Sequence, residues 1–404
     1  MTDVIKGATG FGTDVVWAGE KEQRVHRATQ VPVVVSVSYA YDDMDEWYDV
    51  ATGKAPGHIY GRNTNPTVAA FEEKVRILEG AEAATSCTTG MAAISNTLYT
   101  FLRPGDRVVS IKDTYGGTNR IFSEFLPNIN VEVTLCDTGD HQAMEREIKK
   151  GCKVVYLETP TNPTLKITDI ERIAKVAKQV GAIVIADNTF ATPVNQNPLK
   201  LGVDLVLHSA TKFLGGHADA LGGVVCGSKE LVEQIYHYRE INGASLAPWD
   251  AYLLLRGMKT MKLRVLQQAE NAMQIARYLE KHELVEAVYY PGLETHAHHD
   301  IAKKQMKGFG GMLSFALKGG MKSVSILLPQ LKLANCAANL GSVETTFGPA
   351  RTTSHVEVSE EERKAIGIPD GLVRVSAGIE DTEDLIADLE QAFDYLAERM
   401  KSRS

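Results

Sequence analysis

The stretches KVVYLETPTNP (153–163), AIVIADNT (182–189) and DLVLHSATK (204–212) decide the fold that this sequence predicts. Each begins with a short run rich in Val, Ile and Leu and then turns polar. Near-continuous apolar strands of this kind are typical of a parallel sheet that helices cover on both faces. Similar runs occur at 107–111, 131–135 and 222–225, with helical stretches such as 170–180 between them. The alternation predicts an α/β fold.

Polar side chains follow three of these predicted strands directly. Glu158, Asp187 and Lys212 come after successive strands, and Ser209 precedes the lysine. Ligands of open α/β sheets bind beyond the carboxyl ends of the strands, so we expect these groups to face one crevice. Earlier, SCTTGMAA (86–93) opens a predicted helix, whose free N–H groups and dipole suit a phosphate.

This set of groups is what pyridoxal 5'-phosphate (PLP) requires. A lysine amine forms a Schiff base with its aldehyde, and a carboxylate keeps its ring nitrogen protonated so that the ring accepts carbanion electrons. Taken singly, each feature has a simpler explanation, since most lysines are solvated and an aspartate after a strand is often a helix cap. The joint order of the groups along the chain favours a PLP site.

The composition excludes several other classes of protein. The 404 residues include 43 Lys and Arg against 51 Asp and Glu, a formal net charge of −8, which does not fit a chain that binds nucleic acid or anionic membranes over its surface. No apolar run approaches the roughly 18 residues that span a bilayer, and residues 1–6 lack a signal-peptide pattern. The five cysteines form no C-x-x-C pair. We therefore expect a cytoplasmic enzyme with no membrane or nucleic-acid partner.

Longer motifs give the sequence a specific resemblance that extends from about residue 31 to 396. They are YGRNTNPT (60–67), TTGMAA (88–93), YGGTNR (115–120), ETPTNP (158–163), DNT (187–189), HSATK (208–212), RGMKT (256–260) and RVSAG (374–378). With these motifs the chain resembles the Cys/Met-metabolism family of PLP-dependent enzymes, which includes cystathionine γ-synthase and γ-lyase. The resemblance implies fold type I, like aspartate aminotransferase, with a mostly parallel seven-stranded sheet and a smaller C-terminal α/β domain.

The resemblance also implies a division of the chain and an assembly. An N-terminal arm (1–65) would reach a neighbouring subunit, a large PLP-binding domain would cover 66–260, and a small domain would cover 261–404. A long helix near 249–281 would link the two domains. The expected assembly is a homotetramer of two dimers that share active sites.

Residue roles are carried over from the family's motifs. Lys212 would bind PLP covalently and move protons, Asp187 would pair with the ring nitrogen, and Tyr115 would stack on the ring. The expected phosphate ligands are Gly90, Met91, Ser209 and Thr211, with Tyr60 and Arg62 from a neighbouring subunit. The expected substrate ligands are Arg374 for the carboxylate, helped by Asn162 and Ser342, with Glu344 and Tyr60 nearby. No metal is expected, and we interpret THAHHD (295–300) as a loop.

The implied reaction is γ-elimination or γ-replacement on a γ-substituted L-amino acid. Within the family, methionine γ-lyases typically carry a cysteine soon after this tyrosine, whereas this chain has Gly116-Gly117 there. These glycines, and Glu344 at a position that resembles the site for the distal amino group of cystathionine, favour a cystathionine γ-synthase or γ-lyase. Ile59 and the long arm resemble O-acetylhomoserine sulfhydrylases instead. The acidic run 42–46 allows a γ-lyase for a cationic substrate such as canavanine, although we prefer to interpret it as a solvated acidic loop. A catalytically silent PLP-binding paralogue also remains open, as does a redox role for Cys87.

Overall fold

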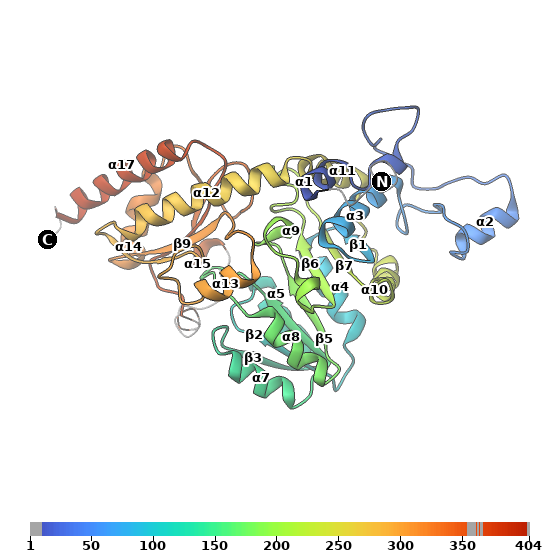
Figure 1. The fold of residues 1–404 in the computed structure, drawn as a ribbon, viewed down its shortest axis with the longest axis horizontal. Helices are drawn as coiled ribbons and strands as arrows, with labels where there is room; N and C mark the ends of the chain where they lie inside the picture. The colour runs from blue at the N-terminus through green and yellow to red at the C-terminus, as the bar shows by residue number, and fades with distance from the viewer. Residues whose placement is uncertain (1–9, 354–360, 362, 364–366, 402–404) are drawn as a thin grey trace.

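The computed structural model describes residues 10–353, 361, 363 and 367–401. Figure 1 shows three parts: a body that carries the larger sheet, a second lobe beside it that carries the smaller sheet, and an N-terminal arm that projects away from the body. Among the described helices, none is long and apolar enough to cross a membrane.

The larger sheet has seven strands in the order β1-β7-β6-β5-β4-β2-β3. Only β7 runs antiparallel to its neighbours, β6 and β1, so the predicted mostly parallel sheet is confirmed. The strands are β1 (Ala83–Cys87), β2 (Arg107–Ile111), β3 (Glu132–Cys136), β4 (Val154–Glu158), β5 (Ile183–Asp187), β6 (Leu205–Ser209) and β7 (Gly223–Gly227). The sequence pattern did not predict β1, because its residues AATSC are small and only weakly strand-forming.

Helices cover both faces of this sheet, as the apolar strands require. Val155 and Leu157 of β4 belong to one core cluster, whereas Val154 and Tyr156 of the same strand belong to another. The first cluster includes residues of α3 (Pro66–Glu79) and α8 (Ile170–Gln179), and the second includes residues of α4 (Gly90–Phe101) and α10 (Lys229–Asn242). Alternate residues of a strand point to opposite faces, so Glu158 lies on the same face as Val154 and Tyr156.

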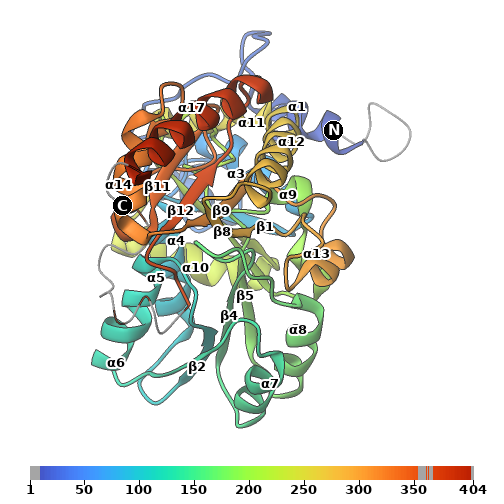
Figure 2. The ribbon, with the colours of Figure 1, turned by 90° about the vertical axis from the view of Figure 1, so that its left-hand side faces the viewer.

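The smaller sheet has five strands in the order β10-β11-β12-β9-β8. They are β8 (Val285–Tyr289), β9 (Met312–Leu317), β10 (Asn335–Cys336), β11 (Thr346–Pro349) and β12 (Leu372–Ser376). The long helices α12 (Met261–Glu280) and α17 (Thr382–Lys401) pack together against this sheet, and Figure 2 shows them side by side over it. The sheet carries Arg374 on its central strand and brings it toward the body of the molecule.

The predicted long linking helix is in fact two helices. α11 (Pro248–Met258) ends before α12 begins, and Thr260 between them has a non-helical ψ of 2°. The guanidinium of Arg264 donates to the carbonyl of Gly257 at 2.9 Å and to those of Phe213 and Leu214. The first contact satisfies a carbonyl group near the end of α11, and the other two tie the start of α12 to the loop after β6, which local helix propensity cannot reveal.

The N-terminal arm is anchored to the body at several points, among them buried Val31 and Glu20, and part of it projects away. The fully buried carboxylate of Glu20 accepts from Lys74 and from Lys259, both at 2.7 Å, which ties the chain after α1 (Phe11–Trp17) to the body. Farther along, α2 (Met44–Ala51) projects outward and leaves Met44 70% and Tyr48 61% exposed. Exposed apolar side chains on a projecting helix are typical of a surface that a partner covers.

Candidate active site

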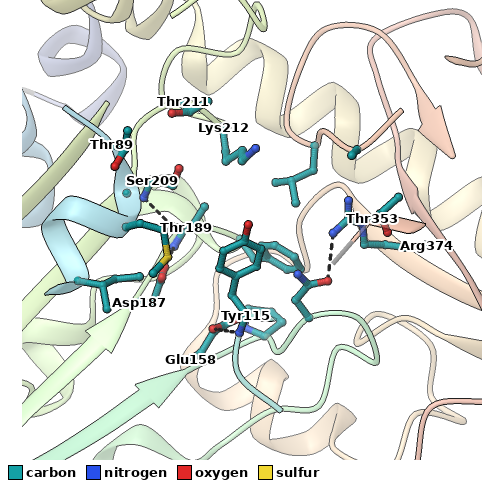
Figure 3. A pocket seen from close by; sticks show the side chains of 18 of the residues that line it. Thr89, Tyr115, Glu158, Asp187, Thr189, Ser209, Thr211, Lys212, Thr353 and Arg374 are labelled. Atoms are coloured by element: carbon teal, nitrogen blue, oxygen red, sulfur yellow. Dashed lines mark hydrogen bonds between the residues drawn. The ribbon is translucent and has the colours of Figure 1, made fainter. Parts of the chain in front are cut away.

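A cavity of about 200 Å³ opens at the carboxyl ends of β4, β5 and β6, where the sequence predicted a crevice (Figure 3). It brings together nine predicted site residues: Gly90, Met91, Tyr115, Asn162, Asp187, Ser209, Thr211, Lys212 and Arg374. Ten further residues complete its wall, among them Thr89, Glu158, Thr189, Phe190, Leu340 and Thr353. Both sheets thus contribute to a single site.

Lys212 lies on the loop after β6, and its side chain points into this cavity. Its Nζ donates to Oδ1 of Asn339 at 3.0 Å. Burial, with a smaller effect of the Arg374 charge, lowers the pKa of the Lys212 amine to about 8. At pH 7 roughly a tenth of the amine is therefore unprotonated, far more than for a solvated lysine, and this form can act as a nucleophile or a general base.

Asp187 ends β5 and places its carboxylate at the bottom of the cavity. Oδ1 accepts the backbone N–H of Thr189 at 2.9 Å, and burial raises the pKa of the carboxyl group against the hydrogen bonds from Thr189. His208 on the next strand is paired with Glu79 through Nε2 at 2.6 Å, and its charge is a smaller effect that lowers the pKa of Asp187. A protonated ring nitrogen is the kind of cationic partner that this buried carboxylate fits.

The start of α4 forms the third corner of the cavity. Thr89 caps the helix by accepting the N–H of Ala92, which leaves the first N–H groups of Gly90 and Met91 facing the cavity lining. A Cβ atom at Gly90 would lie 2.7 Å from Cβ of Ser209, so only glycine allows the helix start and the serine to approach this closely. The N–H groups and the serine hydroxyl form a cradle for a phosphate.

These three corners fit PLP at three separate points. An amine, a buried carboxylate and an anion cradle line one cavity, which corresponds to the aldehyde, the ring nitrogen and the phosphate of the cofactor. The donor set therefore agrees with the cofactor that the sequence predicted.

Tyr115 extends its ring into the same space from the start of α5 (Gly116–Arg120), and its backbone N–H donates to Oε2 of Glu158 at 2.8 Å. A Cβ atom at Gly117 would lie 2.9 Å from Sδ of Met91 and 3.0 Å from Cε1 of Tyr115. A larger residue at position 117 would therefore displace the tyrosine ring or the methionine.

Arg374 faces the cavity from β12 of the smaller sheet. Its Nη1 donates to Oδ1 of Asn162 at 3.1 Å, and its Nη2 donates to the carbonyl oxygen of Asn339 at 3.2 Å. Burial lowers the pKa of Arg374 to about 10, which still leaves it charged at neutral pH. A buried, oriented guanidinium is well suited to bind a carboxylate.

Four predicted residues do not line the cavity of this chain. Ser342 is buried and donates to the carbonyl of Glu344 at 3.2 Å, while the Glu344 side chain is exposed. Tyr60 is 43% exposed on the arm, and Arg62 donates to the carbonyl of Glu240. A single chain does not test the predicted contact of Tyr60 and Arg62 with a neighbouring subunit.

Asn339 is the main site residue that the sequence did not reveal. Its side chain contacts Lys212 and its carbonyl accepts from Arg374, so it joins the two cationic groups of the site. A single asparagine in the segment before β11 carries no pattern that marks it.

The redox role that the sequence left open for Cys87 finds no support in the site. Burial raises the pKa of its thiol to about 11 and disfavours a reactive thiolate.

The histidines at 295–300 serve the packing between the two lobes. Nδ1 of His298 accepts the backbone N–H of Ile167 at 2.9 Å, and Nε2 of His141 accepts that of Asp169 at the same distance. Within the part of the chain that the structure describes, no group of three or more His, Cys, Asp or Glu side chains is arranged to hold a metal ion.

Comparison with known proteins gives one consistent family. Residues 12–394 match the family model described as Cys/Met metabolism PLP-dependent enzyme. An L-methionine γ-lyase of Fusobacterium nucleatum subsp. polymorphum is 44% identical over 390 residues, which cover 96% of this chain and 98% of that protein. A cystathionine γ-lyase of Bacillus subtilis is 46% identical over 357 residues, covering 86% of this chain and 93% of that protein.

Solved structures agree with this result. Cystathionine γ-synthase from Xanthomonas oryzae pv. oryzae, in complex with aminoacrylate and cysteine, superposes with a TM-score of 0.92 at 36% identity, covering 97% of this chain and 99% of that one. Cystathionine γ-lyase from Lactobacillus plantarum, in complex with L-serine, superposes with a TM-score of 0.90 at 37% identity, covering 96% and 100%.

Proposed function

The chain belongs to the Cys/Met-metabolism family of PLP-dependent enzymes, and from this premise we propose that it acts as a cystathionine γ-synthase or γ-lyase. It is a PLP-dependent enzyme of sulfur amino-acid metabolism that eliminates or replaces the γ-substituent of an L-amino acid. The observation that carries the proposal is the convergence of Lys212, Asp187 and Arg374 on one cavity.

Bound PLP supplies an electron sink for the electrons released at Cα of the substrate. Lys212 would hold its aldehyde carbon, Asp187 its ring nitrogen, and Gly90, Met91 and Ser209 its phosphate. The guanidinium of Arg374 binds the substrate carboxylate and orients the Cα–H bond toward Nζ of Lys212. The freed lysine amine, with a pKa near 8, takes the Cα proton and later returns a proton.

The choice between cystathionine and methionine as substrate rests on the residues beside Tyr115. Gly117 packs against Met91 and the tyrosine ring, so the chain has no room for a cysteine there without a shift of either side chain. This favours the cystathionine reaction, although relatives named methionine γ-lyase are 44% identical. Methionine therefore belongs in any substrate test.

The other substrates find less support in this chain. The acidic run 42–46 lies at the start of α2, outside the residues that line the cavity, and Asp43 is engaged as the helix cap. A canavanine γ-lyase would need these carboxylates to reach the site of another subunit. The silent-paralogue hypothesis has to explain why the full set of cofactor and substrate groups is present.

A substrate panel tests the proposal. The purified protein with PLP is incubated with O-acetylhomoserine plus cysteine or sulfide, and separately with cystathionine, methionine and canavanine. For a synthase we expect cystathionine to form from O-acetylhomoserine and cysteine. For a γ-lyase we expect keto acid to form from cystathionine. Either rate should exceed the rates with methionine and canavanine. Sulfide incorporation alone would identify a sulfhydrylase. A stable PLP absorption band without turnover of any of these amino acids would identify a silent paralogue.

We also propose that the active form is a homotetramer of two dimers in the cytoplasm, with Tyr60 and Arg62 reaching the phosphate of a neighbouring site. The outward α2 helix and its exposed apolar side chains support this assembly. The proposed division into a PLP-binding domain (66–260) and a small domain (261–404) follows the separation of the two sheets.

A further inference from the structure

We propose that Glu158 is a positioning residue, whose single buried carboxylate fixes the loop of Tyr115 and the loop of Asn162 relative to each other. The proposal rests on the PLP-dependent function given above. Glu158 would align two ends of the cavity: the end that holds the cofactor ring and the end that binds the substrate carboxylate.

Glu158 is the last residue of β4, and it is 6% exposed. Its Oε2 accepts the backbone N–H of Tyr115 at 2.8 Å. The backbone N–H of Asn162, on the loop that continues directly from β4, also acts on the carboxylate and lowers its pKa. Both partners are main-chain groups, so the carboxylate holds the loop of Tyr115 against the segment that leads to Asn162 rather than fixing the rotamer of one side chain.

The two loops carry groups with different tasks. Tyr115 places its ring in the space above Asp187, where the cofactor ring is expected (Figure 3). Asn162 accepts from Nη1 of Arg374 at 3.1 Å and so orients the guanidinium. Displacing one loop relative to the other would misalign substrate and cofactor, and a shift of about 1 Å in such a site costs on the order of a hundredfold in rate.

The surroundings of Glu158 oppose its ionisation, so the main-chain N–H groups that it faces are needed to hold the carboxylate. Glu158 and Asp187 are register partners on β4 and β5, so their carboxylates point to the same face. Burial, then the charge of Asp187, raise the pKa of Glu158 well above its usual value, and Asp113 adds to this. Tyr156 faces the pair from β4. The N–H groups of Tyr115 and Asn162 oppose these effects, so loops and carboxylate stabilise each other.

The test compares Glu158→Gln with Glu72→Gln in the PLP-loaded protein. Glutamine keeps the shape of the side chain but replaces one acceptor oxygen with a donor that faces a backbone N–H. Glu72 is the matched control, because it also accepts a backbone N–H, that of Ser86, together with the Ser86 hydroxyl, both at 2.7 Å, away from the cavity lining. The readouts are the visible circular dichroism of bound PLP and the affinity for glycine, followed by the absorption change of the cofactor.

We expect Glu158→Gln to weaken glycine binding roughly tenfold, which corresponds to one misaligned hydrogen bond to a charged group, and to reduce the visible dichroism of PLP. Glu72→Gln should lower the melting temperature but leave both readouts unchanged. Unchanged readouts in Glu158→Gln, or equal changes in Glu72→Gln, would overturn the proposal.

If Glu158→Gln does not fold, Glu158→Asp is measured in the same way, because it keeps the carboxylate and retracts it by one methylene. Wild-type readouts in that variant would count against the proposal, and weaker glycine binding with reduced dichroism would support it. Glycine has no γ-substituent, so these results do not depend on the γ-substrate. Failure of the proposed function would instead appear as a wild-type protein that binds no PLP or turns over no γ-substituted amino acid.

Discussion

The cavity and the N-terminal arm differ in how completely one chain builds them. The cavity lies where strands of one sheet end and where the other sheet packs against them, and its groups are held by buried hydrogen bonds. The arm is joined to the body at several points, among them Glu20 and Asn63, but the side chains of Tyr60 and Arg62 are exposed. One region is self-contained, and the other presents its predicted functional residues outward. Buried hydrogen bonds within one chain thus hold the cavity residues in place, whereas the arm leaves Tyr60 and Arg62 exposed.

Replacing Lys212 with alanine tests the self-contained region and should have the largest effect. The variant loses both the covalent attachment of PLP and the base, so we expect activity to fall by at least about 10⁴-fold. The visible absorption band of the lysine-bound cofactor should disappear, as a spectrum of the purified variant would show. A variant that kept this band would contradict the assignment. Thr260→Ser, at the helix break outside the cavity lining, serves as the control.

Replacing Glu20 with glutamine tests how the arm is anchored. Lys74 is fully buried, and burial lowers its pKa while Glu20 opposes that effect, so removing the carboxylate leaves a buried charge unpaired. We expect a loss of about 3–5 kcal/mol in the free energy of unfolding, measured with urea. Glu73→Gln, which removes an exposed partner of Arg76, should cost about 1 kcal/mol or less.

Limited proteolysis adds a local readout to that experiment. If Glu20 anchors the arm, Glu20→Gln should increase cleavage within residues 10–65 before the rest of the chain unfolds. Cleavage at the same rate in both variants would mean that the arm is held by other contacts.

Mixing two impaired variants tests whether Arg62 serves the active site of a neighbouring subunit. Arg62→Ala should lower activity roughly tenfold to a hundredfold, as expected for the loss of a charged contact to the phosphate. If Arg62 serves a neighbouring site, subunits of Arg62→Ala reassembled with subunits of Lys212→Ala form some sites with both residues intact. A random equal mixture should then regain roughly a quarter of wild-type activity. No recovery after verified exchange of subunits would place Arg62 in the service of its own chain.

The sequence predicted the cavity better than its surroundings, for physical reasons. Buried parallel strands are continuous apolar runs, so the sequence alone places the residues that end β4, β5 and β6 at one edge of the sheet. β1 escaped detection because AATSC lacks large apolar residues. The break between α11 and α12 depends on Arg264 reaching across to other segments.

Contacts over long separations in the chain were equally out of reach. Asn339 meets Lys212 from 127 residues away, and only the packing of the two lobes brings them together. The same packing gives the site its Arg374, which the sequence could place only through the family's motif.

Burial of His296 between the two lobes should make the protein less stable in acid. His296 accepts the N–H of His298 at 3.2 Å, and the backbone of Leu165 in the body of the molecule acts on its ring. Burial, with the charges of His298 and His299, lowers the pKa of His296 from 6.5 to about 4. Between pH 6.5 and about 4, His296 therefore binds a proton in the unfolded chain but not in the folded chain. Stability is complete above pH 6.5 and is lost as the pH falls toward 4.

We expect His296 to account for roughly 1–2 kcal/mol of lost unfolding free energy by pH 5, and His298, whose pKa burial also lowers, to add to it. Urea unfolding at pH 7, 6 and 5 measures the loss. His296→Asn, which keeps an acceptor but does not titrate, should flatten this dependence, whereas His26→Asn on the exposed arm should leave it unchanged. A steep wild-type profile that persists in His296→Asn would place the acid-sensitive group elsewhere in the protein, whereas a flattened profile would assign it to His296.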